Sequence, residues 1–207
     1  MPRTRIKICG LTRPEDVCAA VDAGADAIGL VFYPPSPRNV ALERAEELAR
    51  LVPPFVTLVG LFVNPARSEV ARVLDRVPLQ LLQFHGDERE QDCAGHGLPW
   101  VKAARVRPGL DLVEFVSSYP SASGILLDAF VEGYGGGGKV FDWSLIPSGL
   151  DTRLILSGGL DPDNVGEAVR NLRPWAVDVS SGVEQAKGIK DAGRIAAFIS
   201  GVRNADG

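Results

Sequence analysis

The sequence predicts a single-domain α/β protein, an eight-stranded parallel (β/α)8 TIM barrel that spans residues 1–207. Short apolar runs alternate along the chain with segments of helical spacing, which is the pattern of βα units that feed a parallel sheet. Several runs are apolar at successive positions, as strands covered on both faces must be. With 207 residues, 45% of them apolar, the chain has the size at which such a barrel forms one domain.

The apolar runs give eight expected strands. They are Arg5 to Cys9, Ala27 to Phe32, Val56 to Phe62, Leu79 to Phe84, Trp100 to Ala103, Gly124 to Leu127, Arg153 to Leu156, and Ala176 to Val179. In a barrel of this kind the functional side chains lie at the carboxyl ends of the strands and on the loops that follow. The chemistry is therefore expected where each run ends.

Capping residues indicate where the intervening helices begin. Thr12 and Glu15 have the spacing of a capping box, and Gly24 is placed to end that helix. Asn64-Pro65 and Asp161-Pro162 each resemble an N-cap followed by a proline in the first helical turn. These signals agree in phase with the predicted strands.

Other segments are less regular. The last helix is indicated by Ile195, Ala196, Phe198 and Ile199. The segment after Asp87 has little apolar face and the piece after Trp143 is short, so the helical pattern is weakest at these two places. The glycine run Gly135 to Gly138 is too short for a domain linker, and we expect a mobile loop beside the site.

Composition and charge exclude several classes of protein. The formal charge of −4, with acidic and basic residues mixed, gives no concentrated positive field to hold nucleic acid. The three cysteines, Cys9, Cys18 and Cys93, are widely spaced, which argues against a disulfide framework or a four-thiolate metal site and favours reduced, cytosolic thiols. No apolar stretch is long enough for a signal peptide or a membrane span. A soluble, cytoplasmic protein is expected.

Two reactive side chains end apolar runs, the thiol of Cys9 and the carboxyl of Asp128. A thiol in an apolar strand is often an inert core group, and a carboxyl after a strand often caps a helix. Strand alternation places Lys7 and Cys9 on the face opposite Ile6 and Ile8, inside the barrel, where a nearby ammonium favours the thiolate. A carboxyl partly withdrawn from water keeps its proton more readily, so Asp128 could act as a general acid.

Barrel closure sets the eighth strand beside the first. Alternation then turns Asp178 inward, so Lys7 and Asp178 are expected to form a buried pair beneath the site. Cys18 and Cys93 fall on expected helices and are predicted to pack rather than react.

Glycine-containing turns follow the last two strands, Gly158-Gly159 after the seventh and Ser180-Ser181-Gly182 after the eighth. Either could be a tight turn and no more. Because loops at these two places often hold a phosphate in such barrels, their joint placement favours a phosphorylated small molecule as the ligand.

Two further loop residues are candidate contacts of a ligand. The guanidinium fork of Arg38 matches a carboxylate in geometry, although a solvated surface charge is an equal alternative. His85 has no second histidine or carboxylate at metal-ligand spacing, so we expect a hydrogen-bonding residue and no metal site.

The motifs taken together resemble those of the phosphoribosylanthranilate isomerase family of tryptophan biosynthesis, along the length of the chain. They are Lys7-Ile8-Cys9-Gly10, Ser36-Pro37-Arg38, Leu61-Phe62-Val63-Asn64, Gln83-Phe84-His85-Gly86, Leu127-Asp128, Phe141-Asp142-Trp143, Ser157-Gly158-Gly159-Leu160 and Asp178-Val179-Ser180-Ser181-Gly182-Val183-Glu184. The resemblance implies a single-domain barrel without a cofactor, a thiol base at Cys9, a carboxyl acid at Asp128 and a carboxylate-binding role for Arg38. Two positions depart from the family pattern: Gly137 stands where a threonine is usual, and Phe84 where leucine is common.

The expected reaction is the Amadori rearrangement of N-(5-phosphoribosyl)anthranilate to 1-(2-carboxyphenylamino)-1-deoxyribulose 5-phosphate. Asp128 would protonate the ribose ring oxygen, and Cys9 would remove the proton from the neighbouring sugar carbon. Lys7, Arg38, His85 and Asp178 are the expected substrate-binding residues, and the partner assembly is a monomer or a homodimer.

Two alternatives remain open. One is the related aminoaldose–ketose isomerase of histidine biosynthesis, whose substrate carries two phosphates; the segment Leu61 to Pro65 lacks the glycine pair that a second anion loop would need. The other is a noncatalytic phosphosugar-binding barrel, which would need neither Cys9 nor Asp128.

Overall fold

The structure is a computed structural model that describes residues 3–129, 142–147 and 149–207. Within these ranges the predicted barrel is confirmed, because each strand pairs in parallel with the next in the chain and the eighth pairs with the first. The strands are β1 (Arg5–Cys9), β2 (Ala27–Phe32), β3 (Thr57–Phe62), β4 (Leu81–Phe84), β5 (Trp100–Val106), β6 (Ile125–Ala129), β7 (Leu154–Leu156) and β8 (Ala176–Val179).

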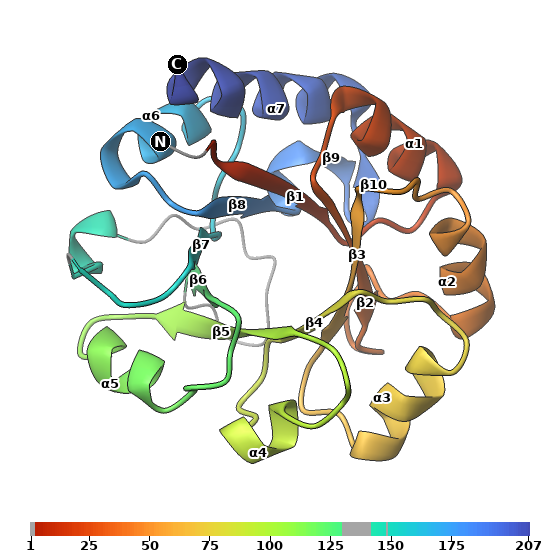
Figure 1. Ribbon diagram of the computed structural model, residues 1–207. Coiled ribbons are helices and arrows are strands. Elements are labelled where there is room, and N and C mark those ends of the chain that lie inside the picture. Colours follow the sequence, from red (N-terminus) through yellow and green to blue (C-terminus); the bar gives the residue numbers. More distant parts are fainter. Residues whose placement is uncertain (1–2, 130–141, 148) are drawn as a thin grey trace.

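Helices surround the barrel on its outside (Figure 1). They are α1 (Pro14–Ala23), α2 (Leu42–Ala49), α3 (Arg67–Leu74), α4 (Glu90–Cys93), α5 (Leu112–Ser117), α6 (Val165–Leu172) and α7 (Ala192–Asp206), with two short 3-10 turns, η1 (Trp143–Leu145) and η2 (Ser181–Val183). A two-stranded antiparallel hairpin, β9 (Glu184–Ala186) and β10 (Ile189–Lys190), separates η2 from α7. None of the helices in the described ranges is long and apolar enough to cross a membrane.

The two ends of the chain meet on one side of the barrel. Helix α7 lies between α1 and α6 and next to β1 (Figure 1). The carboxylate of Asp206, at the end of α7, accepts hydrogen bonds from the Thr4 backbone N–H at 2.8 Å and from the Thr4 hydroxyl at 2.7 Å. The last helix therefore fixes the strand from which the barrel starts.

Alternation along the strands divides outer from inner residues as predicted. Ile6 and Ile8 belong to the main core cluster, which also contains residues of α1 and α7. A separate inner cluster fills the barrel and consists of Val101, Ala103, Leu126, Ile155 and Ala176. Since Asp128 follows Leu126 by two residues, its side chain points into the barrel mouth.

Strands β5 and β6 run further than the sequence indicated. The expected ends were Ala103 and Leu127, whereas pairing continues through Arg105 opposite Asp128 and on to Ala129. The sequence pattern did not predict strand at Arg105 and Asp128 because they are charged. Their side chains face the polar mouth of the barrel, where an apolar residue is not required. Asp128 is therefore held in the sheet rather than in the following loop.

The predicted capping box of the first helix is wrong. Helix α1 begins at Pro14, which needs no hydrogen bond for its nitrogen, and Arg13 occupies the N-cap position without a side-chain cap. The Thr12 hydroxyl instead donates to the carbonyl of Gly188 at 2.6 Å, a contact between segments distant in sequence. The predicted end is confirmed, because Gly24 adopts the left-handed conformation with φ 92°.

The other two predicted N-caps, Asn64 and Asp161, lie two and three residues before the observed N-caps, Ala66 and Asn164. Helix α3 begins at Arg67, where the Glu69 carboxylate accepts from the Ala66 N–H at 2.7 Å. Helix α6 begins at Val165, and the Asp161 carboxylate caps the turn that precedes it. In both loops the polar residue is used to shape the connection from strand to helix.

Three smaller predictions have different outcomes. Cys93 is fully buried as expected, but Cys18 is exposed on α1, so its predicted packing is wrong. Its neighbours Val17 and Ala20 occupy the buried stripe of that helix. The predictions for Gly135 to Gly138 and for Phe141 fall outside the described residues.

Phe84 stands where leucine is common in the family that the motifs resemble, and aromatic packing on the outer side of β4 explains the larger residue. Phe84 is fully buried, with its ring centroid 6.2 Å from that of Phe62 and 6.1 Å from that of Trp100. The larger ring fills space between the barrel wall and the segment around α4, which has few apolar residues of its own.

Replacing Phe84 by alanine is expected to lower the free energy of unfolding by about 3–5 kcal/mol, because it removes a fully buried ring and leaves a cavity. Phe55→Ala is the matched control, since the Phe55 side chain is fully exposed and its loss should change stability by no more than about 0.5 kcal/mol. Urea unfolding followed by circular dichroism measures both values. Equal effects of the two substitutions would contradict this account of the core.

Candidate active site

The predicted site residues gather at the carboxyl ends of the barrel strands. Cys9 ends β1, Asp128 lies near the end of β6, and the remaining candidates lie at β4, β8 and in the loops after β2, β7 and β8. All of these strand ends open on the same side of a parallel barrel. The fold therefore brings the candidate residues to one mouth, as expected.

Cys9 lies in an apolar part of this mouth. It is 4% exposed and clusters with Val31 and Leu61, the inward residues of β2 and β3. Tyr33 and Val63, two residues further along the same strands, pack partly buried against this cluster. The surface beside the thiol can therefore accept an aromatic ring.

The buried pair predicted beneath the site is present. Lys7 and Asp178 are register partners on β1 and β8, and the Lys7 ammonium donates to the Asp178 carboxylate at 2.8 Å. Burial is the largest single effect and by itself would lower the pKa of Lys7, but the charges and hydrogen bonds of Asp178 and Cys9 together raise that pKa above its ordinary value. The hydroxyl of Ser157, at the end of β7, is a second neighbour of Asp178 at 3.4 Å.

The ionisation expected for Cys9 needs a correction. The charge and hydrogen bond of Lys7 do lower the pKa of the thiol, as the sequence indicated. Burial has the larger effect and raises the pKa of Cys9 above its ordinary value, with the Asp178 carboxylate adding to the rise. Lys7 therefore limits the effect of burial on the pKa of Cys9 and does not reverse it.

Asp128 is held by a histidine. Its Oδ2 atom lies 3.0 Å from Nε2 of His85, and Nδ1 of His85 lies 3.0 Å from the side-chain amide of Gln83. All three side chains are buried. His85 thus contacts the proposed acid, and both of its ring nitrogens already have protein partners.

The two glycine-containing turns predicted to bind phosphate pack against each other. Gly158 and Gly159 both have positive φ, 77° and 67°, which lets the chain turn sharply as it leaves β7. A side chain at Gly182 would overlap the carbonyl of Leu160, so the turn after β8 can approach the turn after β7 only with glycine there. A side chain at Gly158 would also meet Asp128, which places this double turn directly beside the acid.

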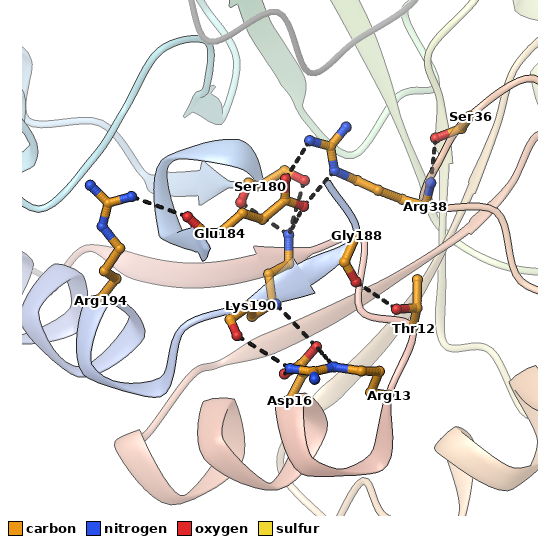
Figure 2. A network of polar contacts seen from close by, with 10 residues as sticks. All are labelled: Thr12, Arg13, Asp16, Ser36, Arg38, Ser180, Glu184, Gly188, Lys190 and Arg194. Carbon is orange, nitrogen blue, oxygen red and sulfur yellow. Dashed lines mark hydrogen bonds and ion pairs between the residues drawn. The ribbon is translucent and has the colours of Figure 1, made fainter. Parts of the chain in front are cut away.

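Arg38 is not a solvated surface charge. It is 8% exposed, and its Nε and Nη2 atoms donate to the two carboxylate oxygens of Glu184, each at 2.7 Å (Figure 2). Glu184 also accepts a hydrogen bond from Lys190 at 2.9 Å. Burial alone would raise the pKa of Glu184, but the hydrogen bonds and charges of Arg38 and Lys190 together lower it below its ordinary value.

Sequence reasoning missed Glu184, Lys190 and Gln83 as members of the site. Glu184 closes the motif that begins at Asp178, and a carboxylate at the end of the predicted anion loop was a usable signal. Lys190 carries no local signal, because its partners lie on a hairpin whose pairing is not visible in the sequence. Among the described residues no group of three or more His, Cys, Asp or Glu side chains is arranged to hold a metal ion.

Comparison with known proteins agrees with this geometry. The family model described as N-(5'phosphoribosyl)anthranilate (PRA) isomerase matches residues 6–201. The N-(5'-phosphoribosyl)anthranilate isomerase of Dechloromonas aromatica is 65% identical over 204 residues, which cover 99% of this chain and 98% of that protein.

Solved structures agree as well. The phosphoribosyl anthranilate isomerase of Thermotoga maritima superposes with a TM-score of 0.90 at 42% identity, covering 97% of this chain and 99% of the other. A phosphoribosyl anthranilate isomerase in complex with reduced 1-(o-carboxyphenylamino)-1-deoxyribulose 5-phosphate gives a TM-score of 0.87 at 40% identity, with the same coverage. The barrel, its mouth and these matches over nearly the whole chain show that the protein belongs to the N-(5'-phosphoribosyl)anthranilate isomerase family.

Proposed function

We propose that Cys9 and Asp128, as general base and general acid, carry out the reaction of the family, the Amadori rearrangement of N-(5'-phosphoribosyl)anthranilate in tryptophan biosynthesis. The observation that carries this assignment is the position of the two groups. Both side chains are buried and point into the barrel at the carboxyl ends of their strands, β1 and β6. The two strands that lie between β6 and β1 in the barrel, β7 and β8, are followed by the glycine-containing turns that pack against each other. A sugar phosphate anchored at those turns has a thiol on one side and a carboxyl on the other.

The substrate is a phosphorylated small molecule, and we assign its phosphate to the turns formed by Gly158, Gly159, Ser180, Ser181 and Gly182. The Ser180 hydroxyl accepts a hydrogen bond from Lys190 at 3.2 Å, which leaves its own hydrogen available to donate to a phosphate oxygen. Backbone N–H groups near glycines can approach an anion closely.

The chemistry then needs two proton transfers at the sugar. Asp128 donates a proton to the ribose ring oxygen, and the bond from that oxygen to the anomeric carbon breaks to give an open-chain iminium ion. The thiolate of Cys9 removes the proton from the adjacent carbon, and the electron pair of that C–H bond moves toward the nitrogen to form an enolamine. Tautomerisation of the enolamine gives the aminoketose. Each placed proton transfer contributes about 10²- to 10⁴-fold in rate.

Supporting residues divide between the two catalytic groups. His85 is proposed to orient Asp128, on the basis of their 3.0 Å contact, and to line the substrate site from β4. Lys7 and Asp178 are proposed to set the charge beneath Cys9 and to border the sugar. Arg38 is proposed to bind the anthranilate carboxylate, with the ring against the apolar surface of Tyr33 and Val63.

The setting of the enzyme follows from its pathway. We propose a cytoplasmic location for this biosynthetic isomerase and, as its assembly, a monomer or a homodimer. No cofactor takes part in the proposed steps, since each step moves only a proton and its bonding electrons.

Adding the protein to phosphoribosylanthranilate generated in situ is expected to abolish the fluorescence of that compound.

Cys9→Ser and Asp128→Asn should each lower kcat by about 10²-fold or more, because each removes one proton transfer. Circular dichroism should show that both variants fold. Near-normal turnover in either variant would remove that residue from the mechanism.

Arg38→Ala is expected to raise KM by roughly 10- to 100-fold, since hydrogen bonds to charged groups contribute about 1.5–3 kcal/mol. Arg89→Ala is the control, because Arg89 is an exposed arginine paired with Asp92 outside the site. Steady-state kinetics measures both. An unchanged KM in the Arg38 variant would refute the carboxylate contact.

The thiol of Cys9 is expected to ionise with a midpoint above the ordinary thiol pKa of about 8.5, because burial raises the pKa of Cys9. The ultraviolet absorbance of the thiolate, recorded against pH as the difference between wild type and Cys9→Ser, measures this midpoint independently of the ionisation of Asp128. A midpoint below the ordinary thiol value would contradict this effect of burial.

A further inference from the structure

We propose that Glu184 and Lys190 are positioning residues that fix Arg38 for its carboxylate, and that the β9–β10 hairpin exists in this chain to hold them. The proposal rests on the proposed function, in which Arg38 binds the anthranilate carboxylate. It adds two residues and one structural element to the part of the site that selects an acidic aromatic group.

An arginine needs such support to act as a specific clamp. Its side chain is long, and ordering a free arginine on a ligand costs rotamer entropy. In this protein the Arg38 side chain is already ordered when the chain folds, because Glu184 binds it through two parallel hydrogen bonds of 2.7 Å each. Both residues are buried, which strengthens these bonds.

The same pairing decides which edge of the guanidinium remains for a ligand. Glu184 uses the edge formed by Nε and Nη2. The third nitrogen, Nη1, points away from Glu184 (Figure 2). A guanidinium carries five N–H donors, so the Nη1–Nη2 edge can still form a fork with a second carboxylate.

Lys190 in turn holds Glu184. Its side chain is fully buried, and Nζ donates to Glu184 Oε1 at 2.9 Å, to the Ser180 carbonyl at 3.0 Å and to the Ser180 hydroxyl at 3.2 Å. An ammonium has three donors, so these contacts can use all of them. Lys190 therefore acts on the substrate through its neighbours, and it links the carboxylate side of the site to the proposed phosphate turn.

The charges of this cluster favour an anion. Arg38, Lys190 and Glu184, taken together, carry one more positive than negative charge. Burial, with a contribution from Arg38, lowers the pKa of Lys190 despite the attraction of Glu184. A substrate carboxylate placed on the free edge of Arg38 would balance the cluster.

The hairpin is tied to the loop after β1 at several points (Figure 2). Thr12 donates to the carbonyl of Gly188 at 2.6 Å, and the Lys190 N–H donates to the Asp16 carboxylate at 3.2 Å. Arg13 binds the same carboxylate and also donates to the Lys190 carbonyl at 3.3 Å. These contacts fix the turn of the hairpin and its strand β10 to the segment that follows the proposed base.

Gly10 completes this arrangement. A side-chain carbon built at Gly10 would lie 2.5 Å from Cδ of Arg38 and 3.0 Å from Oγ of Ser180. The stem of Arg38 thus packs directly on the backbone next to Cys9. The clamp, the base and the phosphate turn are held at fixed separations by one connected set of contacts.

The test uses two stable ligands whose only difference is the carboxylate. They are reduced 1-(o-carboxyphenylamino)-1-deoxyribulose 5-phosphate and the same compound without its carboxyl group. Titration calorimetry gives the ratio of the two affinities for each variant. Wild type is expected to bind the carboxylated ligand about 10- to 100-fold more tightly, in line with the strength of charged hydrogen bonds.

Glu184→Gln is expected to reduce this ratio about tenfold and to leave the affinity for the carboxyl-free ligand within about twofold. KM should rise while kcat stays near the wild-type value, because the lost interaction is the same in ground and transition states. Lys190→Met should also reduce the ratio. In an Arg38→Ala background, Glu184→Gln should have no further effect on it.

Glu46→Gln is the matched control, since Glu46 binds Arg76 at 2.7 Å on the outer helices, and it should change neither affinity. Glu184→Asp is the second variant should Glu184→Gln fail to fold, and its shorter side chain should also reduce the ratio. If wild type shows no preference for the carboxylated ligand, the proposed role of Arg38 fails. If that preference survives in the Glu184 variants, or if they weaken both ligands equally, the positioning role fails while the Arg38 contact stands.

Discussion

Closure of the sheet between β1 and β8 is the constraint on which the rest of the structure depends. It pairs Lys7 with Asp178 in register and joins residues 171 positions apart. The same closure brings the turn after β8 close to Cys9, at the end of β1, and to Arg38, in the loop after β2. The hydrogen bonds of Asp206 to Thr4 hold this seam from outside. Without it the acid on β6 and the base on β1 would belong to separate surfaces.

The interior of the mouth holds many charges, and their pairing explains how that is tolerated. An isolated buried charge is strongly unfavourable, whereas a paired and hydrogen-bonded one can be kept at moderate cost. Lys7 is paired with Asp178, and Arg38 and Lys190 share Glu184. Cys9, which has no full counterion of its own, keeps its proton more readily. The site is thus prepared for an anionic substrate, whose carboxylate and phosphate add negative charge where the protein has an excess of positive charge.

The proposed acid and the proposed carboxylate-binding arginine are supported in different ways. Asp128 lies within a strand and is fixed by His85 from β4 and by the turn after β7, so its position is set by the barrel itself. The arginine assigned to the carboxylate lies in a loop, and its position is set by a hairpin inserted after β8. The proposed acid is thus held by the sheet, whereas the arginine proposed to bind the carboxylate is held by an element added to the barrel.

The sequence by itself determined the barrel, its strand order and the inward direction of Lys7, Cys9 and Asp178, because a period of two along buried strands and the order of βα units leave few alternatives. It also placed Asp128 and the two glycine turns at the mouth. It misplaced the starts of α1 and α3, because Thr12 and Asn64 make contacts with distant segments that outweigh local capping. Only the tertiary structure decided that burial dominates the pKa of Cys9 and that Glu184 and Lys190 hold Arg38. Those effects depend on which charges a closed barrel brings together in a buried space, and no local pattern of residues records that.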